Sequence, residues 1–365
     1  MSIDRIVKLM LVFVPVALIA ELLHADPIVI FITAALGIIP LADLIGEATE
    51  EIAHHTGPKI GGLLNATLGN AAELIITILA IQAGLLDLVK ASIVGSIIGN
   101  LLLVMGLALL LGGLKHGIQK FDAKTAGLNA TLLILAVMAL AVPSLFDVAI
   151  SDNRAAEFGL SEGVAIVMIV LYGLSVYYSF THAGTEPSGA VTREAAVEEH
   201  HSKWSIRTSV IILIVTTLGI VFLSEALVGA VEHVTATLGL SEFFIGIIII
   251  PLVGNIAEHL VAVQVALKNK MELSMAVSVG SSLQVALFVA PVLVFITLIM
   301  TGQPLLLVFS SFELIAIVAT VLVTAFIALD GESNWLEGAM LLAVYIIIAI
   351  AFFYLPSAGG TVPHP

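Results

Sequence analysis

Cysteine is absent from this chain of 365 residues, and charged residues make up only 11% of it. Without cysteine the chain has no disulfide framework, no zinc–thiolate site and no thiol chemistry. A soluble domain carries roughly 25% charged residues, whereas here 60% of the residues are apolar before the 30 glycines are counted. No soluble core buries so much apolar surface, which excludes a soluble enzyme, a disordered chain and a nucleic-acid binder. The chain belongs in a lipid bilayer.

Long apolar segments follow one another along almost the whole chain. A helix needs about 20 apolar residues to cross the hydrocarbon core, and about 11 segments reach that length. They cover residues 6–24, 27–53, 60–84, 88–112, 122–142, 160–183, 207–231, 241–267, 271–300, 305–329 and 334–355. The first has the basic start of a signal peptide, but no small-residue cleavage site follows, so we expect it to be retained. The short alternating strands of a membrane β-barrel are not visible, and an all-α integral membrane protein is predicted.

The basic residues predict the orientation of these spans. With a cytoplasmic N-terminus, only Lys90 and Arg154 fall on external connections, and the rest of the 13 Lys and Arg residues fall on the cytoplasmic side. This asymmetry follows the positive-inside rule and predicts an external C-terminus. We expect a multi-pass protein of a prokaryotic cell (inner) membrane. The net charge of −14 disfavours anionic partners and suits a cation as substrate.

Two parts of the sequence match each other. The segment 69–74 (GNAAEL) matches 254–259 (GNIAEH) at an offset of 185 residues, and the acidic stretch 41–50 matches 223–232 at an offset of 182. Five spans separate the equivalent helices, an odd number, so the two copies face opposite ways across the membrane. Such inverted-topology repeats are typical of secondary transporters, with a site where the halves meet.

The repeat gives a 1 + 5 + 5 organisation. The predicted units are a first helix (1–25), a first repeat (26–183), an acidic cytoplasmic linker (184–206), a second repeat (207–356) and an external tail (357–365). The linker is interpreted as solvated chain; the alternative is that its Glu and His residues sense a cation or pH.

Glu73 and Glu258 lie near the middle of their spans, at matching positions of the repeat. An ionised carboxylate at that depth costs about 2.5–3.5 kcal/mol, so a purely structural role is the less favoured alternative. Two carboxylates brought together repel each other, and a divalent cation or protons remove that repulsion. Cation and protons then compete for the same oxygens, which couples their movements in an antiporter.

Further oxygen ligands are expected around the two glutamates, because calcium takes six to eight oxygens. Asn70 and Asn255 lie three residues before each glutamate, on the same helix face. The preceding glycines favour a bend that frees backbone carbonyls. Helix packing is the alternative role for the polar residues of the following spans. The full predicted metal set is Glu73, Glu258, Asn70, Asn255, Gly69, Gly254, Ser96, Asn100, Ser281 and Gln284.

A second group of residues is predicted to admit cations or relay protons. Acidic residues gather at the cytoplasmic end of the second span and, in the inverted copy, near the external end of the seventh. The alternative for the former is a solvated helix end, and for the histidine that follows Glu258 it is packing. The predicted proton-relay or entry residues are Glu47, Glu50, Glu51, His259, Glu225 and Glu232.

The paired G-N-x-x-E segments, each followed by a G-S-rich helix, resemble the cation/proton exchanger branch of the cation/calcium exchanger superfamily. The match includes 254–259, Lys268-Asn269-Lys270 and 280–284, and extends over spans two to eleven. The resemblance implies calcium export or sequestration driven by inward proton flow, with no cofactor and no enzymatic reaction. It assigns Glu73 and Glu258 as central glutamates, the stretch around 47–51 as the acidic helix, and Ser281 and Gln284 as second-repeat residues of the site. Members of this family can assemble as homotrimers.

Several alternatives remain open at the level of the sequence. The sodium-driven branch has a serine or threonine and a proline in place of this G-N-x-x-E pattern, which argues against sodium as the driving ion. Manganese/proton or sodium/proton exchange by the same fold is the runner-up, and a cation channel is less favoured because a channel needs a continuous wet pore. An intramembrane enzyme is disfavoured because no H-E-x-x-H motif is present.

Overall fold

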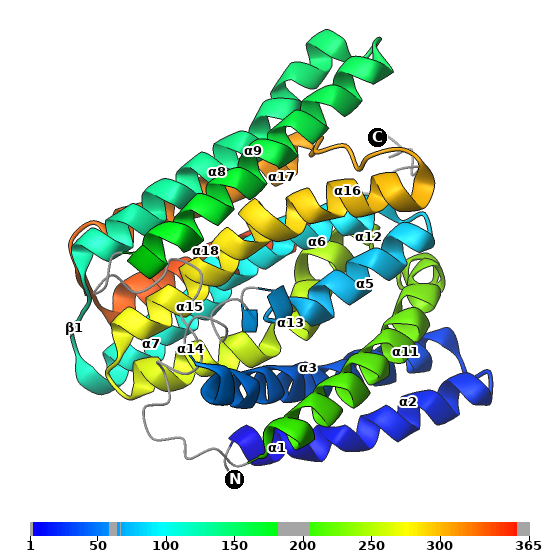
Figure 1. Cartoon of the computed structure of the whole chain (residues 1–365), viewed down its shortest axis with the longest axis horizontal. Helices are drawn as coiled ribbons and strands as arrows, with labels where there is room; N and C mark the ends of the chain where they lie inside the picture. The colour runs from blue at the N-terminus through cyan, green and yellow to red at the C-terminus, as the bar shows by residue number, and fades with distance from the viewer. Residues whose placement is uncertain (1–2, 58–63, 66, 182–203, 356–365) are drawn as a thin grey trace.

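The computed structural model describes residues 3–57, 64–65, 67–181 and 204–355. Apart from two short strands, the described elements are helices, most of which run roughly along the long axis of the molecule (Figure 1). Among the described residues, eight helices are long and apolar enough to cross a membrane, or nine when one bent pair is counted as a span. The all-α membrane architecture is confirmed.

The number of about 11 spans is compatible with this count. The first predicted span is divided into α1 (Ile3–Leu9), η1 (Met10–Val12) and α2 (Phe13–Leu22). The third includes residues that are not described, ahead of the short apolar helix α5 (Ala71–Gln82). The first and third predicted spans are therefore not among the long helices counted above.

The remaining helices form two similar series. The equivalent pairs are α3 (Pro27–Thr56) and α11 (Ile206–Leu238), α5 and α14 (Ile256–Leu267), α6 (Leu86–Ile98) and α15 (Met271–Gln284), α7 (Met105–His116) and α16 (Ala290–Thr301), α8 (Ala123–Ile150) and α17 (Ser311–Ala328), and α9 (Arg154–Thr181) and α18 (Trp335–Phe353). The helices α5 and α14 both have 12 residues and begin 185 residues apart, which is the offset of the matched motifs.

The crossing of α3 and α11 repeats one contact in both directions. A Cβ added at Gly37 would lie 3.1 Å from Cδ2 of Leu223, and one added at Gly219 would lie 2.9 Å from Cδ1 of Leu41. Both glycines and both leucines are 182 residues apart. Small residues let membrane helices approach closely, so this doubled glycine–leucine contact holds the two repeats together. Figure 1 shows α3 and α11 side by side, with α1 and α2 along their outer side.

Breaks and π-helical turns lie close to the matched segments of the two repeats. The pair Glu242–Gly254 and Ile256–Leu267 is bent by 63°, so the break expected at Gly254 is present. The first half of this pair contains α12 (Glu242–Phe244), the π-helical η3 (Ile245–Ile249) and α13 (Ile250–Gly254). Two further π-helical segments, η2 (Gly99–Val104) and η4 (Val285–Val289), follow α6 and α15 at equivalent places. Such segments frequently accompany functional sites.

The tenth predicted span begins later than the sequence indicates. Residues 305–309 are apolar, with Leu305, Leu307 and Phe309 buried, yet they are not helical, and α17 begins only at Ser311. The backbone N–H groups of Leu307 and Phe309 donate to the hydroxyls of Ser161 (3.2 Å) and Ser144 (2.8 Å). These serines satisfy the backbone without a helix, and the capping box of Ser310 and Glu313 then starts α17. The predicted start at 305 was therefore wrong.

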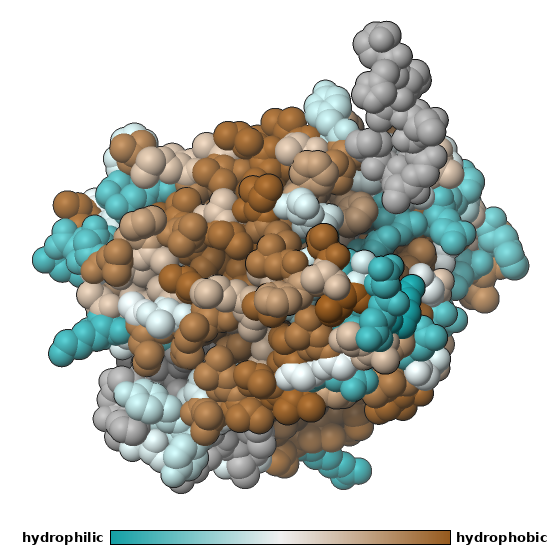
Figure 2. Space-filling model, turned by 90° about the horizontal axis from the view of Figure 1, so that it is seen from above, coloured by the Kyte–Doolittle hydropathy of each residue, from teal (hydrophilic) through white to brown (hydrophobic). Residues whose placement is uncertain are grey.

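The outer surface matches a lipid environment. Large side chains such as Phe326 (71% exposed) and Ile347 (65%) point outward from predicted spans, which is unfavourable in water and ordinary in lipid. Figure 2 shows a broad apolar face, with hydrophilic side chains mostly toward the two ends of the long axis. Most of the predicted linker 184–206 lies outside the described residues.

Candidate functional site

The two central glutamates pack against each other's repeat. Glu73 and Glu258 lie in the first turn of α5 and α14. A Cβ added at Gly254 would lie 3.6 Å from the Cβ of Glu73, and one added at Gly69 would lie 3.5 Å from Oε1 of Glu258. The glycine of each G-N-x-x-E segment thus lies in van der Waals range of the glutamate of the other. This close approach brings the two predicted carboxylates into one site.

A buried chain of hydrogen bonds ends at Glu73. The Ser96 hydroxyl of α6 donates to Glu73 Oε1 at 2.5 Å, and Asn255 Nδ2 donates to Ser96 Oγ at 3.1 Å. All three side chains are almost completely buried. Asn255, which stands at the break between α13 and α14, therefore connects the second repeat to the carboxylate of the first.

Two more hydrogen bonds join the repeats. Asn70 Nδ2 donates to Gln284 Oε1 at 2.8 Å, and Asn100 Nδ2 donates to Ser281 Oγ at 3.0 Å. The structure thus brings together the polar residues of the predicted metal set, with the glycines Gly69 and Gly254 between them. Amide side chains that cross between helices also stabilise the packing of membrane helices.

Three buried oxygens of this cluster remain without a hydrogen bond in the part of the chain that the structure describes. They are Glu73 Oε2, Asn70 Oδ1 and Asn255 Oδ1. Leaving a buried acceptor unpaired costs about 1–3 kcal/mol, so the cluster favours a ligand that attracts oxygen lone pairs. Carboxylate and amide oxygens suit a hard cation. No group of three or more His, Cys, Asp or Glu side chains that could hold a metal occurs among the described residues.

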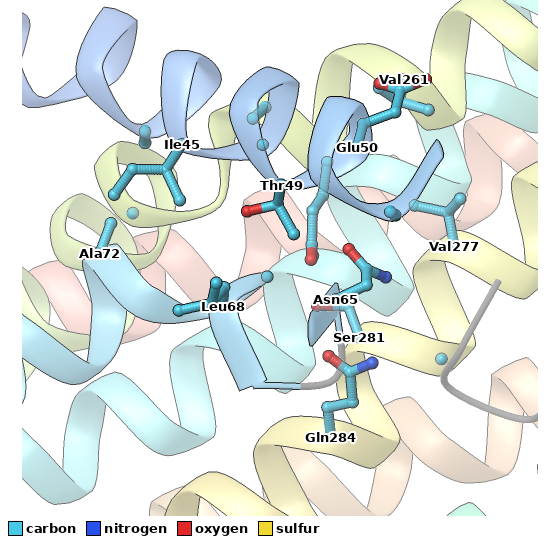
Figure 3. A pocket seen from close by; sticks show the side chains of 18 of the residues that line it. Ile45, Thr49, Glu50, Asn65, Leu68, Ala72, Val261, Val277, Ser281 and Gln284 are labelled. Atoms are coloured by element: carbon cyan, nitrogen blue, oxygen red, sulfur yellow. The ribbon is translucent and has the colours of Figure 1, made fainter. Parts of the chain in front are cut away.

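A cavity reaches one of the two glutamates. Its walls come from the C-terminal half of α3, from the segments around Gly69 and Gly254, and from α14 and α15. The polar residues that line it are Thr49, Glu50, Asn65, Glu258, Ser281 and Gln284. Figure 3 shows the Glu50 side chain reaching from α3 toward Asn65. Glu73, only 1% exposed, does not line this cavity.

The predicted entry residues are not equivalent in the structure. Glu50 lines the cavity, whereas Glu47 does not. Glu51 is buried and accepts a long hydrogen bond from the N–H of Trp204 at 3.4 Å. His259 is buried outside the cavity lining.

The two acidic residues of the inverted copy lie elsewhere. Glu225 and Glu232 are exposed on α11, and the structure does not bring them to this cavity. Of the two predicted groups of entry residues, only the one on α3 contributes a residue, Glu50, to this cavity, and the paired entry role stays a prediction.

Two cavity residues were not foreseen from the sequence. Thr49 is 3% exposed, and its hydroxyl has no hydrogen-bond partner among the described residues. Asn65 precedes Gly69 by one helical turn, and its backbone carbonyl accepts from the Gly69 N–H at 2.9 Å. The available signals were the position of Thr49 next to Glu50 and the four-residue spacing from Asn65 to Gly69.

Buried unpaired oxygens where two repeats meet, within a bundle of lipid-facing helices, are typical of a membrane transporter of cations. The model of the family described as "Sodium/calcium exchanger protein" matches residues 27–181 and 208–354, and the chain belongs to this family. The two matched stretches correspond to the two repeats.

Curated relatives are similar over nearly their whole length. A "Ca(2+)/H(+) antiporter" of Aphanothece halophytica is 48% identical over 360 residues, covering 95% of this chain and 96% of the relative. The "Ca(2+)/H(+) antiporter ChaA" of Bacillus subtilis (strain 168) is 45% identical, covering 94% and 97%. The solved structure of native YfkE superposes with a TM-score of 0.83 at 41% identity, covering 97% of this chain and all of that one. The chain thus falls in the cation/proton exchanger branch, whose members are transporters rather than enzymes.

Proposed function

We propose that this protein exchanges calcium for protons across the membrane, and that the carboxylates of Glu73 and Glu258 bind either cargo. The observation that carries the proposal is the buried set of unpaired oxygens around two carboxylates from opposite repeats. The relatives described as Ca(2+)/H(+) antiporters support calcium and protons as the cargoes, and none of them points to manganese.

Charge supplies the coupling. Two ionised carboxylates at the bilayer centre cost on the order of 5–7 kcal/mol. One Ca²⁺ neutralises both charges, and so do two protons. Only the loaded, neutral site then changes its exposure at a low energy cost, so calcium cannot return without protons moving the other way.

The coordination is proposed to be all oxygen. Glu73 and Glu258 supply up to four oxygens, and Asn70 and Asn255 supply two more through Oδ1. Ser281 and water complete the six to eight that calcium takes. Magnesium requires tight octahedral geometry and sheds water reluctantly, so this irregular set favours calcium. We expect manganese to compete more weakly and magnesium to be transported poorly.

The cavity represents one half of an alternating-access cycle. Glu258 is reached through it, while Glu73 is sealed behind Ser96 and Asn255. The cavity opens beside the C-terminal half of α3, which the distribution of Lys and Arg assigns to the cytoplasm. We propose that this is the inward-facing state and that Glu50 attracts calcium at its mouth. The outward-facing state exchanges the roles of the repeats.

Uptake by everted membrane vesicles tests the proposed function. With an imposed proton gradient, vesicles that contain the protein should accumulate radioactive calcium, and the protein-free control should not. Excess manganese should reduce this uptake partly, and equal magnesium should leave it nearly unchanged. Strong inhibition by equal magnesium, or sodium movement without calcium movement, contradicts the assignment.

A further inference from the structure

The far end of the helix that carries Glu258 is held by side chains of the first repeat. Lys115 Nζ donates to the carbonyl oxygen of Leu267 at 2.9 Å, and Nε2 of His116 lies 2.8 Å from the same oxygen. Gln119 Nε2 donates to the carbonyl oxygen of Ala266 at 3.0 Å. The last carbonyls of a helix lack partners within the helix and favour positive charge nearby. Two side chains from the last turn of α7 and one from the connection to α8 thus cap α14.

Gln119 reaches beyond the helix to the next turn. Its Nε2 also donates to Asn269 Oδ1 at 2.9 Å. Asn269 has φ = +61°, a left-handed conformation that Asn tolerates better than most residues. It stands in the turn 268–270 between α14 and α15, which carry Glu258 and Gln284. One amide group thus fixes both the end of the first helix and the turn to the second.

The surroundings of Gln119 hold it in this position. Gln119 is 1% exposed and begins β1 (Gln119–Lys120), which pairs with β2 (Glu332–Ser333) in an antiparallel register that places it opposite Ser333. A Cβ at residue 112 would collide with its Oε1, so Gly112 of α7 makes room for the side chain. A buried, sterically matched glutamine is a fixed support rather than a surface contact.

Among the described residues, the first repeat shows no matching side-chain support. The equivalent helix α5 ends with Gly84 N–H donating to Ile81 and Leu85 N–H to Ala80. The helix α14 has the same two backbone bonds, from Asn269 N–H to Ala266 and from Lys270 N–H to Val265, and has the side-chain donors in addition. Within the described ranges, no side chain donates to the last carbonyls of α5. We call the support of α14 by Lys115, His116 and Gln119 the clamp. Among the described residues, it is present only on the helix that carries Glu258.

We propose that Gln119 and Asn269 are positioning residues for calcium: by clamping α14 and its turn, they hold Glu258 where it shares the cation with Glu73. This inference rests on the proposed function. Eight residues separate Glu258 from Ala266, or about 12 Å of helix, so a small tilt at the clamped end displaces the carboxylate. Loosening the clamp lowers the fraction of molecules with a competent site, and the apparent affinity falls by that fraction.

The test compares the calcium concentration dependence of uptake in variants that remove one or both of the hydrogen bonds donated by Gln119. Gln119→Leu removes both donations, and Asn269→Gly removes the acceptor while glycine keeps the positive φ. Each should raise the half-saturating calcium concentration roughly ten-fold, which corresponds to a fall of the competent fraction to about one tenth. The maximal rate per molecule should stay within about two-fold. Asn269→Asp keeps an acceptor and should restore most of the affinity.

Ser144→Ala is the matched control, because it removes two side-chain bonds to a distant segment, from the N–H of Phe309 and to the carbonyl oxygen of Leu307, away from the clamp. It should leave the half-saturating concentration unchanged. The double variant Gln119→Leu/Asn269→Gly should resemble Gln119→Leu, since both changes break the same bond. Equal half-saturating concentrations in all variants, or no advantage of Asn269→Asp over Asn269→Gly, would overturn the clamp. No proton-driven calcium uptake by the unaltered protein would instead contradict the proposed function.

Discussion

Asn255 of the second repeat donates a hydrogen bond to Ser96 of the first, with 3.1 Å between Nδ2 and Oγ. Because Ser96 uses its own hydrogen toward Glu73, the three groups form a directed chain. Ser281, the counterpart of Ser96, receives its bond from Asn100 rather than from Asn70. The hydrogen bonds of these polar side chains therefore differ between the two repeats, although the sequence motifs match.

Replacing either central glutamate should abolish exchange. Glu73→Gln and Glu258→Gln keep the side-chain shape and cannot carry the exchanged proton. Neither variant should move calcium against its gradient in vesicles, although both should reach the membrane in normal amounts, because an amide is cheaper than a carboxylate in a bilayer. Normal calcium accumulation by either single variant would show that the central site is wrongly assigned.

The variant Glu50→Gln tests whether the carboxylate of Glu50, which lines the cavity, attracts calcium. Loss of its charge should raise the half-saturating calcium concentration by roughly three-fold to ten-fold, with less effect at high ionic strength, because long-range attraction is screened by salt. Glu232→Gln is the control, since Glu232 occupies the matched position in the repeat but is exposed outside the cavity. If both variants respond equally, the effect comes from net charge alone.

The close crossing of α6 and η3 should tolerate no added methyl group. A Cβ at Gly95 would collide with the carbonyl oxygen of Ile247 and lie 2.5 Å from its Cα. Gly95→Ala should lower the free energy of unfolding by about 1–3 kcal/mol, seen as a lower Tm in detergent. Gly127→Ala, in α8 with open space around it, should leave Tm unchanged or raise it, because alanine is the better helix former. A Tm for Gly95→Ala equal to that of the unaltered protein would mean that the two helices can separate freely.

The stability contributed by the N-terminal cap of α8 should depend on pH. Hydrogen bonds from the hydroxyl and backbone N–H of Thr125 lower the pKa of Asp122 below its ordinary range. A depressed pKa means that this cap stabilises the fold above the pKa of the unfolded chain, about 4, and that the stabilisation is lost as pH falls through the lower folded value. Asp122→Asn caps without titrating, so its Tm should change less than that of the unaltered protein below about pH 4. Parallel Tm curves for the two proteins would exclude this contribution.

Much of the site could be predicted because its residues are rare in membranes. A glutamate in mid-span draws attention by its cost, and its recurrence at a fixed offset located Glu73, Glu258 and their asparagines. The non-helical backbone at 305–309 could not be predicted, since its N–H groups donate to serines more than 140 residues earlier in the chain. The clamp could not be predicted for the same reason, because Gln119 and Asn269 are far apart in the sequence and neither belongs to a recognisable motif pair.

The central claim is that calcium and protons compete for the same two carboxylates. Adding calcium to the purified, detergent-solubilised protein in weakly buffered solution measures this directly, because binding must displace protons from the ligands. The account predicts proton release that saturates with calcium binding and that disappears in the double variant Glu73→Gln/Glu258→Gln. Calcium binding without proton release, or full release in the double variant, would contradict it.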